Sequence, residues 1–534
     1  MTTSFVRCVA AICITSVAFF GAPADHATAE TPKDTLVYAT SLSLVISLDP
    51  HQNSDSTSTE IMANLYDRLL AATSDGKLVP QLAESWQVSD KAITFKLRKD
   101  ISFASGRSIT AKDVVWSMTR LMKLNYAVAN KYTTAGYSAD NIESMVHAED
   151  DHTVRLDLTG DMAGDLLLFR LAEVSASIVD RDIVEQHVDA GDWGNGWLRT
   201  RSAGSGPFKL DRWTPNEMVI MSSRQDYWGG APPLKRVIMR HVAESQVQRL
   251  MLDRNDADIA AALSANDVNY FMSSPTAGIQ QVPTGGFFVL AMNASREPLD
   301  NPKVREAIFK AIDFAAIEKS IMGPYGPARH IPVPLSFQDA IPDPKEWAYD
   351  PAVAKQMLAD AGYTPDKPLT IKTIAQPPRV DLATAVQASL SEVGIRAEVI
   401  QGSGADIVSM HRARDFDLLI PQTSAYMTNV LGAMEQFSSN PDNSAKANNA
   451  GNFVWRSAWD IPKLTKLTAT AMRETDPAAR SKMYVDMQET FASLTPAVFP
   501  MFERRTPVAV SNRVQGYVGH PLSATRLENV SKKD

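Results

Sequence analysis

The side chains that could perform covalent chemistry in this sequence do not form any of the common catalytic patterns. The chain contains no Gly-x-Ser-x-Gly, no His-Glu-x-x-His, no phosphate-binding loop ending in Gly-Lys-Ser or Gly-Lys-Thr, and no Gly-x-Gly-x-x-Gly. His147 and His152 flank three acidic residues, but a spacing of five does not place two imidazoles on one helical face. Gly402-Ser403-Gly404 lacks the rest of any motif. We therefore expect a solvated acidic turn and a plain surface turn there, with no catalytic residue, metal site or cofactor.

The charge balance and composition narrow the class of protein further. Lys and Arg number 53 against 61 Asp and Glu, a formal net charge of −8. No basic block could neutralise phosphates, so neither nucleic acid nor an anionic membrane surface is an expected partner. Hydrophobic residues make up 44% and charged residues 21%, as in an ordinary globular protein. A chain of 534 residues exceeds what one hydrophobic core usually organises, so we expect two or three domains.

Residues 1–29 have the pattern of a signal peptide. Arg7 gives a positive start, residues 9–22 are apolar but too short to span a bilayer, and Ala27-Thr28-Ala29 supplies small residues for cleavage. Cleavage would leave Glu30 as the first residue of the mature protein. The alternative, a buried N-terminal helix, is less favoured because glycine, proline and aspartate interrupt the end of the apolar run.

Both cysteines of the chain, Cys8 and Cys13, lie inside the predicted signal peptide. The mature protein would therefore have no thiol for a disulfide, a redox centre or a cysteine-bound metal. Neither cysteine follows a small residue at the end of the apolar run, as a lipid-modified cysteine would. We expect a soluble protein of an oxidising compartment, in the simplest case a bacterial periplasm.

Hydrophobic periodicity and helix-start signals predict the elements that must position any site. Ile93, Phe95 and Leu97 alternate with polar residues, which is the period of a half-buried strand. Thr110, with an aspartate three residues later, predicts the start of an amphipathic helix. Further strands are expected at 35–39, 154–158, 208–210 and 289–292, and further helices at 61–70, after Asn301-Pro302 and from Asp350-Pro351 to Gly362. Helices and strands alternate along the chain, which predicts α/β domains with parallel or mixed sheets.

Ten short segments, distributed over nearly the whole chain after the predicted signal peptide, form a pattern by their order and spacing. They are LYDRL at 65–69, PQLAESW at 80–86, TFKLR at 94–98, TAKDVVWS at 110–117, GSGPF at 204–208, DYWGG at 226–230, PKVREA at 302–307, YDPAVAK at 349–355, AGY at 361–363 and GYV at 516–518. Each segment alone is weakly diagnostic. In this order and spacing, the chain resembles the periplasmic solute-binding proteins of the peptide, opine and nickel class that serve ABC importers, and most of all their dipeptide-binding branch.

The resemblance implies an α/β fold with two lobes, of the type II periplasmic binding proteins. It implies a hinge of two crossover strands near 289–294 and 498–503, and an extra subdomain inserted in the first lobe. The expected partition is a signal peptide at 1–29, a first-lobe core, an inserted subdomain at 66–199 and a second lobe at 290–504. The first-lobe core comprises 30–65, 200–289 and 505–534. A cleft between lobes suits solute capture because closure removes the ligand from water.

The resemblance also implies a set of ligand-binding residues. Arg379 falls where the dipeptide branch carries an arginine that pairs with the ligand's carboxylate, and its planar fork suits an oxyanion. A solvated arginine before a helix is the alternative. Asn53, Ser54 and Asp55 lie in the loop that faces the cleft in relatives, although an ordinary Asx turn would use the same residues. Trp455 could stack on a sugar or heterocycle, or pack between elements.

The segment from Asp417 to Tyr426 departs from the family's peptide-binding pattern. In dipeptide and many oligopeptide binders of the family, an aspartate after an aromatic strand end pairs with the peptide's α-amino group. Here no carboxylate follows Asp417 within the segment, and a buried ammonium without counter-charge is strongly unfavourable. Free peptide is therefore not the expected ligand, unless the anchor is displaced, for example to Asp442. Gln422 and Tyr426 are further candidate ligand contacts.

These observations predict a periplasmic receptor of an ABC importer that binds a small polar organic solute bearing a carboxylate. The expected partners are inner-membrane permease subunits with cytoplasmic ATPases, and the expected oligomeric state is a monomer. Short peptides, an opine or sugar conjugate and a metal chelate remain open as ligands. The alternatives from other classes are a secreted hydrolase, which the missing motifs disfavour, and a periplasmic chaperone, which would need an exposed apolar groove.

Overall fold

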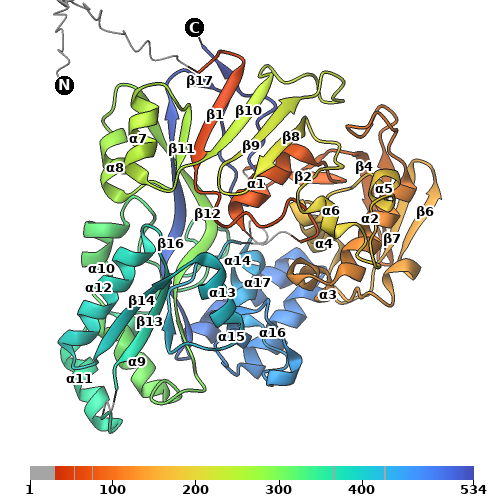
Figure 1. Cartoon of the computed structure of the whole chain (residues 1–534). Coiled ribbons are helices and arrows are strands. Elements are labelled where there is room, and N and C mark those ends of the chain that lie inside the picture. Colours follow the sequence, from red (N-terminus) through yellow and green to blue (C-terminus); the bar gives the residue numbers. More distant parts are fainter. Residues whose placement is uncertain (1–30, 53–54, 75, 365–366, 426–428, 534) are drawn as a thin grey trace, which may run out of the picture.

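The computed structural model describes residues 31–52, 55–74, 76–364, 367–425 and 429–533. Within these residues the main feature is a ten-stranded mixed sheet (Figure 1). From edge to edge its strands are β14 (Ala397–Gly402), β13 (Leu369–Ile374), β15 (Leu418–Leu419), β12 (Ala277–Met292), β16 (Val498–Ser511), β11 (Ile259–Ala261), β1 (Thr35–Thr40), β10 (Arg236–His241), β9 (Met218–Ser223) and β8 (Phe208–Thr214). The sheet is mixed because β1 runs parallel to β10 and β11, whereas β9 and β16 run antiparallel to their neighbours.

Two long antiparallel strands, β12 and β16, join the two halves of this sheet (Figure 1). The half with β1 and β8–β11 is named the first lobe, and the half with β13–β15 the second lobe. The register of β12 on β16 shifts between Pro283 and Phe287, a few residues before the predicted crossover at 289–294. Gly286 lies in this irregular stretch. Only a glycine fits at this position, because a Cβ would stand 2.1 Å from the Thr423 carbonyl oxygen. The predicted two-lobed α/β fold with two crossover strands is confirmed.

Residues 66–199, named the inserted segment, carry a separate antiparallel sheet of four strands among the described residues. Its order is β4 (Ala83–Val88), β5 (Ala92–Leu97), β7 (Thr153–Asp157) and β6 (Val146–Asp150), and a small hairpin of β2 (Leu70–Ala72) and β3 (Leu78–Pro80) precedes it. Ile93, Phe95 and Leu97 of β5 are buried, as their alternation predicts. Thr110 and Asp113 form the predicted capping box at the start of α2 (Ala111–Leu124). Two further short strands, β17 (Val514–Gln515) and β18 (Ser531–Lys532), pair near the C-terminus.

Helices accompany each part of the chain. Those of the first lobe are α1 (Ser56–Leu65), α7 (Ser245–Asp253) and α8 (Ala265–Phe271). Those of the inserted segment are α2, α3 (Asn130–Thr133), α4 (Gly164–Leu171), α5 (Arg181–Glu185) and α6 (Asn195–Leu198). Those of the second lobe are α9 (Pro302–Ala311), α10 (Phe314–Ile317), α11 (Pro351–Asp360), α12 (Arg379–Glu392), α13 (Gly404–Arg412), α14 (Val430–Ser438), α15 (Phe453–Arg456), α16 (Pro462–Arg473) and α17 (Pro477–Ala492). Across the part of the chain that is described, none has the length and apolar character needed to cross a membrane.

The expected helix at 61–70 is displaced in the structure. It begins earlier because Asp55 caps α1 by accepting a hydrogen bond from the Ser58 backbone N–H. It ends at Leu65 because Tyr66 has extended backbone angles (φ −130°, ψ 147°), and Leu70 already belongs to β2. The two later helices begin where their Asn-Pro and Asp-Pro signals predict.

The inserted segment also contacts the second lobe directly. The guanidinium of Arg170 on α4 forms an ion pair with Glu435 on α14, and both side chains are buried. Arg480 on α17 pairs with Asp165 of α4, its Nη1 donating to Oδ1 at 3.1 Å. These ion pairs connect parts of the chain that the sheet itself does not join.

Candidate functional site

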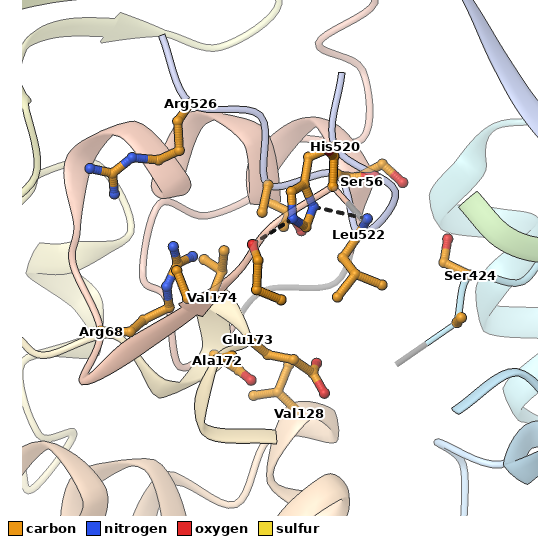
Figure 2. A pocket seen from close by; sticks show the side chains of 18 of the residues that line it. Ser56, Arg68, Val128, Ala172, Glu173, Val174, Ser424, His520, Leu522 and Arg526 are labelled. Atoms are coloured by element: carbon orange, nitrogen blue, oxygen red, sulfur yellow. Dashed lines mark hydrogen bonds between the residues drawn. The ribbon is translucent and has the colours of Figure 1, made fainter. Parts of the chain in front are cut away.

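A cavity of about 710 Å³ lies between the two lobes. This size is typical of sites for small organic ligands. One wall comes from the start of α1, the β2–β3 hairpin, residues 172–175 and the C-terminal residues 516–529, and the other wall from α13, α14, α15 and Ser424. Figure 2 shows Arg68, Glu173 and His520 on one side of the space and Ser424 on the other. A ligand in this cavity would therefore touch segments from both ends of the chain.

A buried ion pair positions the segment that leads to Asp55. Both carboxylate oxygens of Asp49 accept hydrogen bonds from Arg120 of α2, at 2.8 and 2.6 Å, and neither side chain is exposed. Asn195 donates to Asp49 at 2.8 Å, and His51 Nδ1 lies 2.9 Å from Arg120. Burial raises the pKa of Asp49, but the charge and hydrogen bonds of Arg120 outweigh it and the pKa is lowered. Helix α2 thus fixes the backbone just before the predicted cleft loop.

Asp55 lines the cavity and also caps α1, and its contact with a ligand stays a prediction. Its Oδ1 accepts the Ser58 N–H at 2.9 Å, and its Oδ2 accepts the Ser58 hydroxyl. Burial raises the pKa of Asp55 to about 6, against the lowering effect of these hydrogen bonds. The charge of this wall of the cavity therefore changes within the physiological range.

Arg68, in the LYDRL segment, is a buried cation in the cavity wall. It is only 2% exposed, and among the described residues its Nε and Nη1 atoms have no hydrogen-bond partner. Burial, followed by the neighbouring charge of Arg526, lowers the pKa of Arg68 to about 10. The positive charge of this side chain in the cavity wall favours an anionic, oxygen-rich ligand.

The C-terminal residues close the same wall over the hairpin. His520 Nε2 donates to the Ala72 carbonyl oxygen at 2.9 Å and its Nδ1 accepts the Leu522 N–H at 3.1 Å, which defines a neutral imidazole (Figure 2). Burial lowers the pKa of His520 to about 4. Arg526 anchors the tail to the LYDRL segment through a 2.9 Å ion pair with Asp67.

Of the other predicted site residues, Arg379 and Gln422 are described by the structure but do not line this cavity. Arg379 is the first residue of α12 and is buried, 6% exposed, rather than solvated, but it does not line the cavity directly. Gln422 forms an isolated bridge with Phe288 of β12, next to the cavity-lining Ser424. Asn53, Ser54 and Tyr426 lie outside the described residues.

Trp455 has partners on its ring and on its indole nitrogen. The Arg414 guanidinium lies 3.8 Å from the ring centroid, and Nε1 donates to the Ser444 carbonyl oxygen at 2.9 Å. The side chain is 4% exposed and does not line the cavity. This environment favours the packing interpretation, and a contact of Trp455 with ligand stays a prediction.

Sequence reasoning did not single out Arg68, Ser424 or Arg504 as site residues. Arg68 stands inside a motif that the resemblance used, so its position could have been found from the family pattern. Arg504 of β16 donates from Nη1 to the Ser424 hydroxyl at 2.7 Å and to the Thr423 carbonyl oxygen at 3.2 Å. No local sequence pattern around Arg504 predicts this contact, because the contact depends on how β16 packs against residues 423–424.

The histidine pair near 147–152 and the Gly-Ser-Gly turn at 402–404 have local structural roles. His147 lies on β6 with its Nε2 3.2 Å from Asp157, and Ser403 caps α13 by accepting the Asp406 N–H. Among the described residues, no three His, Cys, Asp or Glu side chains are grouped so that they could hold a metal ion. We therefore place the candidate site in the interlobe cavity.

Two lobes joined by paired crossover strands, with a cavity between them, fit the class of solute-binding proteins that the sequence indicates. Comparison with known proteins then places the chain within that class. Residues 77–445 match the family described as bacterial extracellular solute-binding proteins, family 5 Middle, and the chain belongs to this family. It is a solute receptor of an ABC importer, as its sequence predicts.

Individual relatives show how widely the family's ligands vary. The chain is 27% identical over 507 residues to the probable D,D-dipeptide-binding periplasmic protein DdpA of Escherichia coli, covering 94% of each chain. The fold matches the periplasmic binding protein DppA of Helicobacter pylori in complex with the peptide STSA, with a TM-score of 0.81, 23% identity and coverage of 94% and 98%. It also matches AgaA of A. tumefacien R10 in complex with agropinic acid, with a TM-score of 0.79, 22% identity and coverage of 94% and 99%.

Proposed function

We propose that this receptor binds a small polar organic solute bearing a carboxylate, in the cavity between its lobes. The observation that carries the proposal is the presence of buried guanidinium groups with unpartnered N–H atoms. Counting partners among the described residues only, Arg68, a residue of the cavity wall, has two such atoms, and Arg379 has one, Nε. Because an unpaired buried charge is unfavourable, a ligand that supplies carboxylate oxygens would bind where the protein alone is least satisfied.

We further propose that the receptor acts as a periplasmic monomer and delivers its solute to an inner-membrane permease with cytoplasmic ATPases. The curated relative of E. coli is itself described as periplasmic, and the pattern of residues 1–29 supports export. The proposed partition keeps 30–65, 200–289 and 505–534 as the first-lobe core, 66–199 as the inserted subdomain and 290–504 as the second lobe. Strand pairing supports it, because β1 and β8–β11 pair within the first set and β13–β15 within the last.

A short peptide is the second candidate ligand. It is favoured by relatives described as binding D,D-dipeptides, di/tripeptides and dipeptides. Against a free peptide stands residue 425, an alanine in the segment where peptide binders of the family carry an aspartate. An N-blocked or otherwise anionic peptide derivative would satisfy both observations.

The test begins with native mass spectrometry of the protein purified from its host, to identify a retained solute. Calorimetry with that solute then compares the unmodified protein with Arg379→Ala, which should weaken binding by about 2 to 5 kcal/mol for a desolvated pair. Arg379→Lys should recover only part of the loss, because a lysine cannot make the bidentate contact. Arg236→Ala, at an exposed position of β10, serves as the control. Unchanged affinity in Arg379→Ala, or a solute without an anionic group, would contradict the proposal.

A further inference from the structure

Two buried arginines come together where the hinge strands meet the second lobe. Arg379 begins α12 and Arg504 lies on β16, and they are 6% and 8% exposed. Arg379 Nη2 donates to Gln376 Oε1 at 3.2 Å, and its Nε finds no hydrogen-bond partner among the residues that the structure describes. Within the described parts of the chain, neither guanidinium forms an ion pair with a carboxylate. Two buried positive charges without a counter-charge are unfavourable unless something else supplies it.

The electrostatics of the pair are consistent with this geometry. Burial, and after it the charge of Arg504, lowers the pKa of Arg379 to about 10. Burial alone lowers the pKa of Arg504 to about 10. At neutral pH both groups still carry their charge. The N-terminal end of α12, a helix of 14 residues, adds its positive dipole at the same place.

The pair reaches the cavity through Ser424. Arg504 Nη1 donates to the Ser424 hydroxyl at 2.7 Å, and Ser424 lines the cavity wall. The Ser424 carbonyl oxygen accepts a hydrogen bond from Gln436 of α14 at 2.6 Å, and Gln436 lines the cavity as well. On the other side, the Thr284 hydroxyl of β12 donates to the Arg504 carbonyl oxygen at 2.9 Å. The Arg504 backbone is therefore bound to β12, while its side chain reaches the cavity-lining Ser424.

We propose that Arg379, Arg504 and the Ser424 hydroxyl together bind an oxyanion of the ligand, a carboxylate or a phosphoryl group, at the hinge end of the cavity. This inference rests on the proposed function, because it assigns a second cation to the site that Arg379 begins. Two guanidinium groups favour a ligand end with two negative charges over one with a single charge.

The same arrangement excludes an ammonium group from this end of the cavity. The segment that carries an amine-binding aspartate in relatives contains Thr423, Ser424 and Ala425 here, and Arg504 donates to the first two. A free α-amino group beside Ala425 would face a buried positive charge instead of a carboxylate. Like charges in a desolvated site repel strongly, so unmodified peptides should bind poorly.

Small anions test the site without knowledge of the natural solute. Thermal unfolding is measured in sodium phosphate, succinate and acetate, each against sodium chloride at equal ionic strength. We expect phosphate or succinate to raise the unfolding midpoint more than acetate, because these two carry two charges. Phosphate also stabilises proteins by exclusion from their surface, so the comparison between variants decides the result. A phosphoryl ligand predicts the larger effect with phosphate, and a dicarboxylate the larger effect with succinate.

Three variants and a matched control separate binding from folding. Arg504→Gln should raise the anion concentration needed for half-maximal stabilisation by at least about tenfold, as should Arg379→Gln. Arg505→Gln removes the next arginine of β16, which contacts Gln281 at 3.4 Å, and should behave as the unmodified protein. Arg504→Met should unfold in sodium chloride at a midpoint equal to or above that of the unmodified protein, because it removes an unpaired buried charge.

The outcomes distinguish this inference from the proposed function. If Arg379→Gln loses the anion effect and Arg504→Gln keeps it, the role of Arg504 is refuted and carboxylate binding by Arg379 stands. If both variants keep the effect, both proposals are refuted. A lower midpoint of Arg504→Met in sodium chloride, together with an unchanged anion effect in Arg504→Gln, would make Arg504 a purely structural residue.

Discussion

Replacing Asp49 by asparagine removes one charge from the buried ion pair that holds the segment before the cleft loop. The substitution keeps the shape of the side chain and one of its acceptor oxygens. It also turns an amide N–H₂ toward a guanidinium that has only donors. Arg120 would then keep its positive charge at a position with no exposure, and only one of its two hydrogen bonds to this side chain, now 2.8 and 2.6 Å long, would still have an acceptor oxygen.

The structure sets the size of the expected effect. Removing one partner of a fully buried ion pair leaves an uncompensated charge and typically lowers the free energy of unfolding by about 3–5 kcal/mol. His51, 2.9 Å from Arg120, cannot replace the lost negative charge because an imidazole is either neutral or positive, and burial, then the charge of Arg120, keeps it neutral by lowering its pKa to about 4. The Asn195 amide, which donates to Asp49 at 2.8 Å, would also lose a charged acceptor. We therefore expect a loss in the upper part of this range.

The assay is equilibrium unfolding by denaturant at pH 7, followed by circular dichroism. The matched control is Asp100→Asn, which makes the same change in an exposed ion pair, since Asp100 is 61% exposed and pairs with Arg98 at 3.0 Å. An exposed pair contributes less than about 1 kcal/mol, so the control should change stability little. A loss in Asp49→Asn no larger than that in Asp100→Asn would refute the argument that burial makes the pair stabilising.

Three further expectations concern closure, acidity and ligand binding. Glu435→Gln removes the negative charge that Arg170 contacts between the inserted segment and the second lobe. Because this favours the open form, it should weaken solute binding and increase the radius of gyration at partial saturation. Unchanged affinity would argue against a role of this ion pair in closure. His520→Gln should remove a pH dependence of the unfolding free energy. The folded protein holds the His520 pKa at about 4, against an ordinary value of 6.5. The stabilisation by the neutral imidazole is therefore fully present above pH 6.5 and is lost as the pH falls toward 4. The difference in unfolding free energy between the unmodified protein and His520→Gln should change by about 3 kcal/mol over that interval, and parallel pH profiles would contradict it. Saturating solute should raise the thermal midpoint and compact the molecule in small-angle scattering, and an unchanged radius at saturation would count against hinge closure.

Local sequence signals predicted the elements well where the decisive residues are close neighbours. The capping box of Thr110 and Asp113 depends on residues three positions apart, and α2 begins where it predicts. The family pattern in turn predicted the two lobes and the receptor class, because it samples segments along nearly the whole chain. The long strand β12 was predicted only in its last part, since Pro283 and Gly285 resemble a turn when viewed without their partner strand. Pairing with β16 on both sides of this irregular stretch holds the two parts in one long strand.

The candidate site shows the limit of such reasoning. The sequence indicated Arg379 through a resemblance, but it contained no sign that Arg504 would be buried beside it or that Ser424 would connect the pair to the cavity. In the same way, the sequence left open whether Trp455 faces a ligand, whereas the structure places Arg414 over its ring. Helix caps and strand periods are decided by contacts within a few residues, so they can be predicted from the sequence. Whether a charge is buried, paired or left for a ligand depends on which distant segments the fold brings around it, and only the tertiary structure decides that.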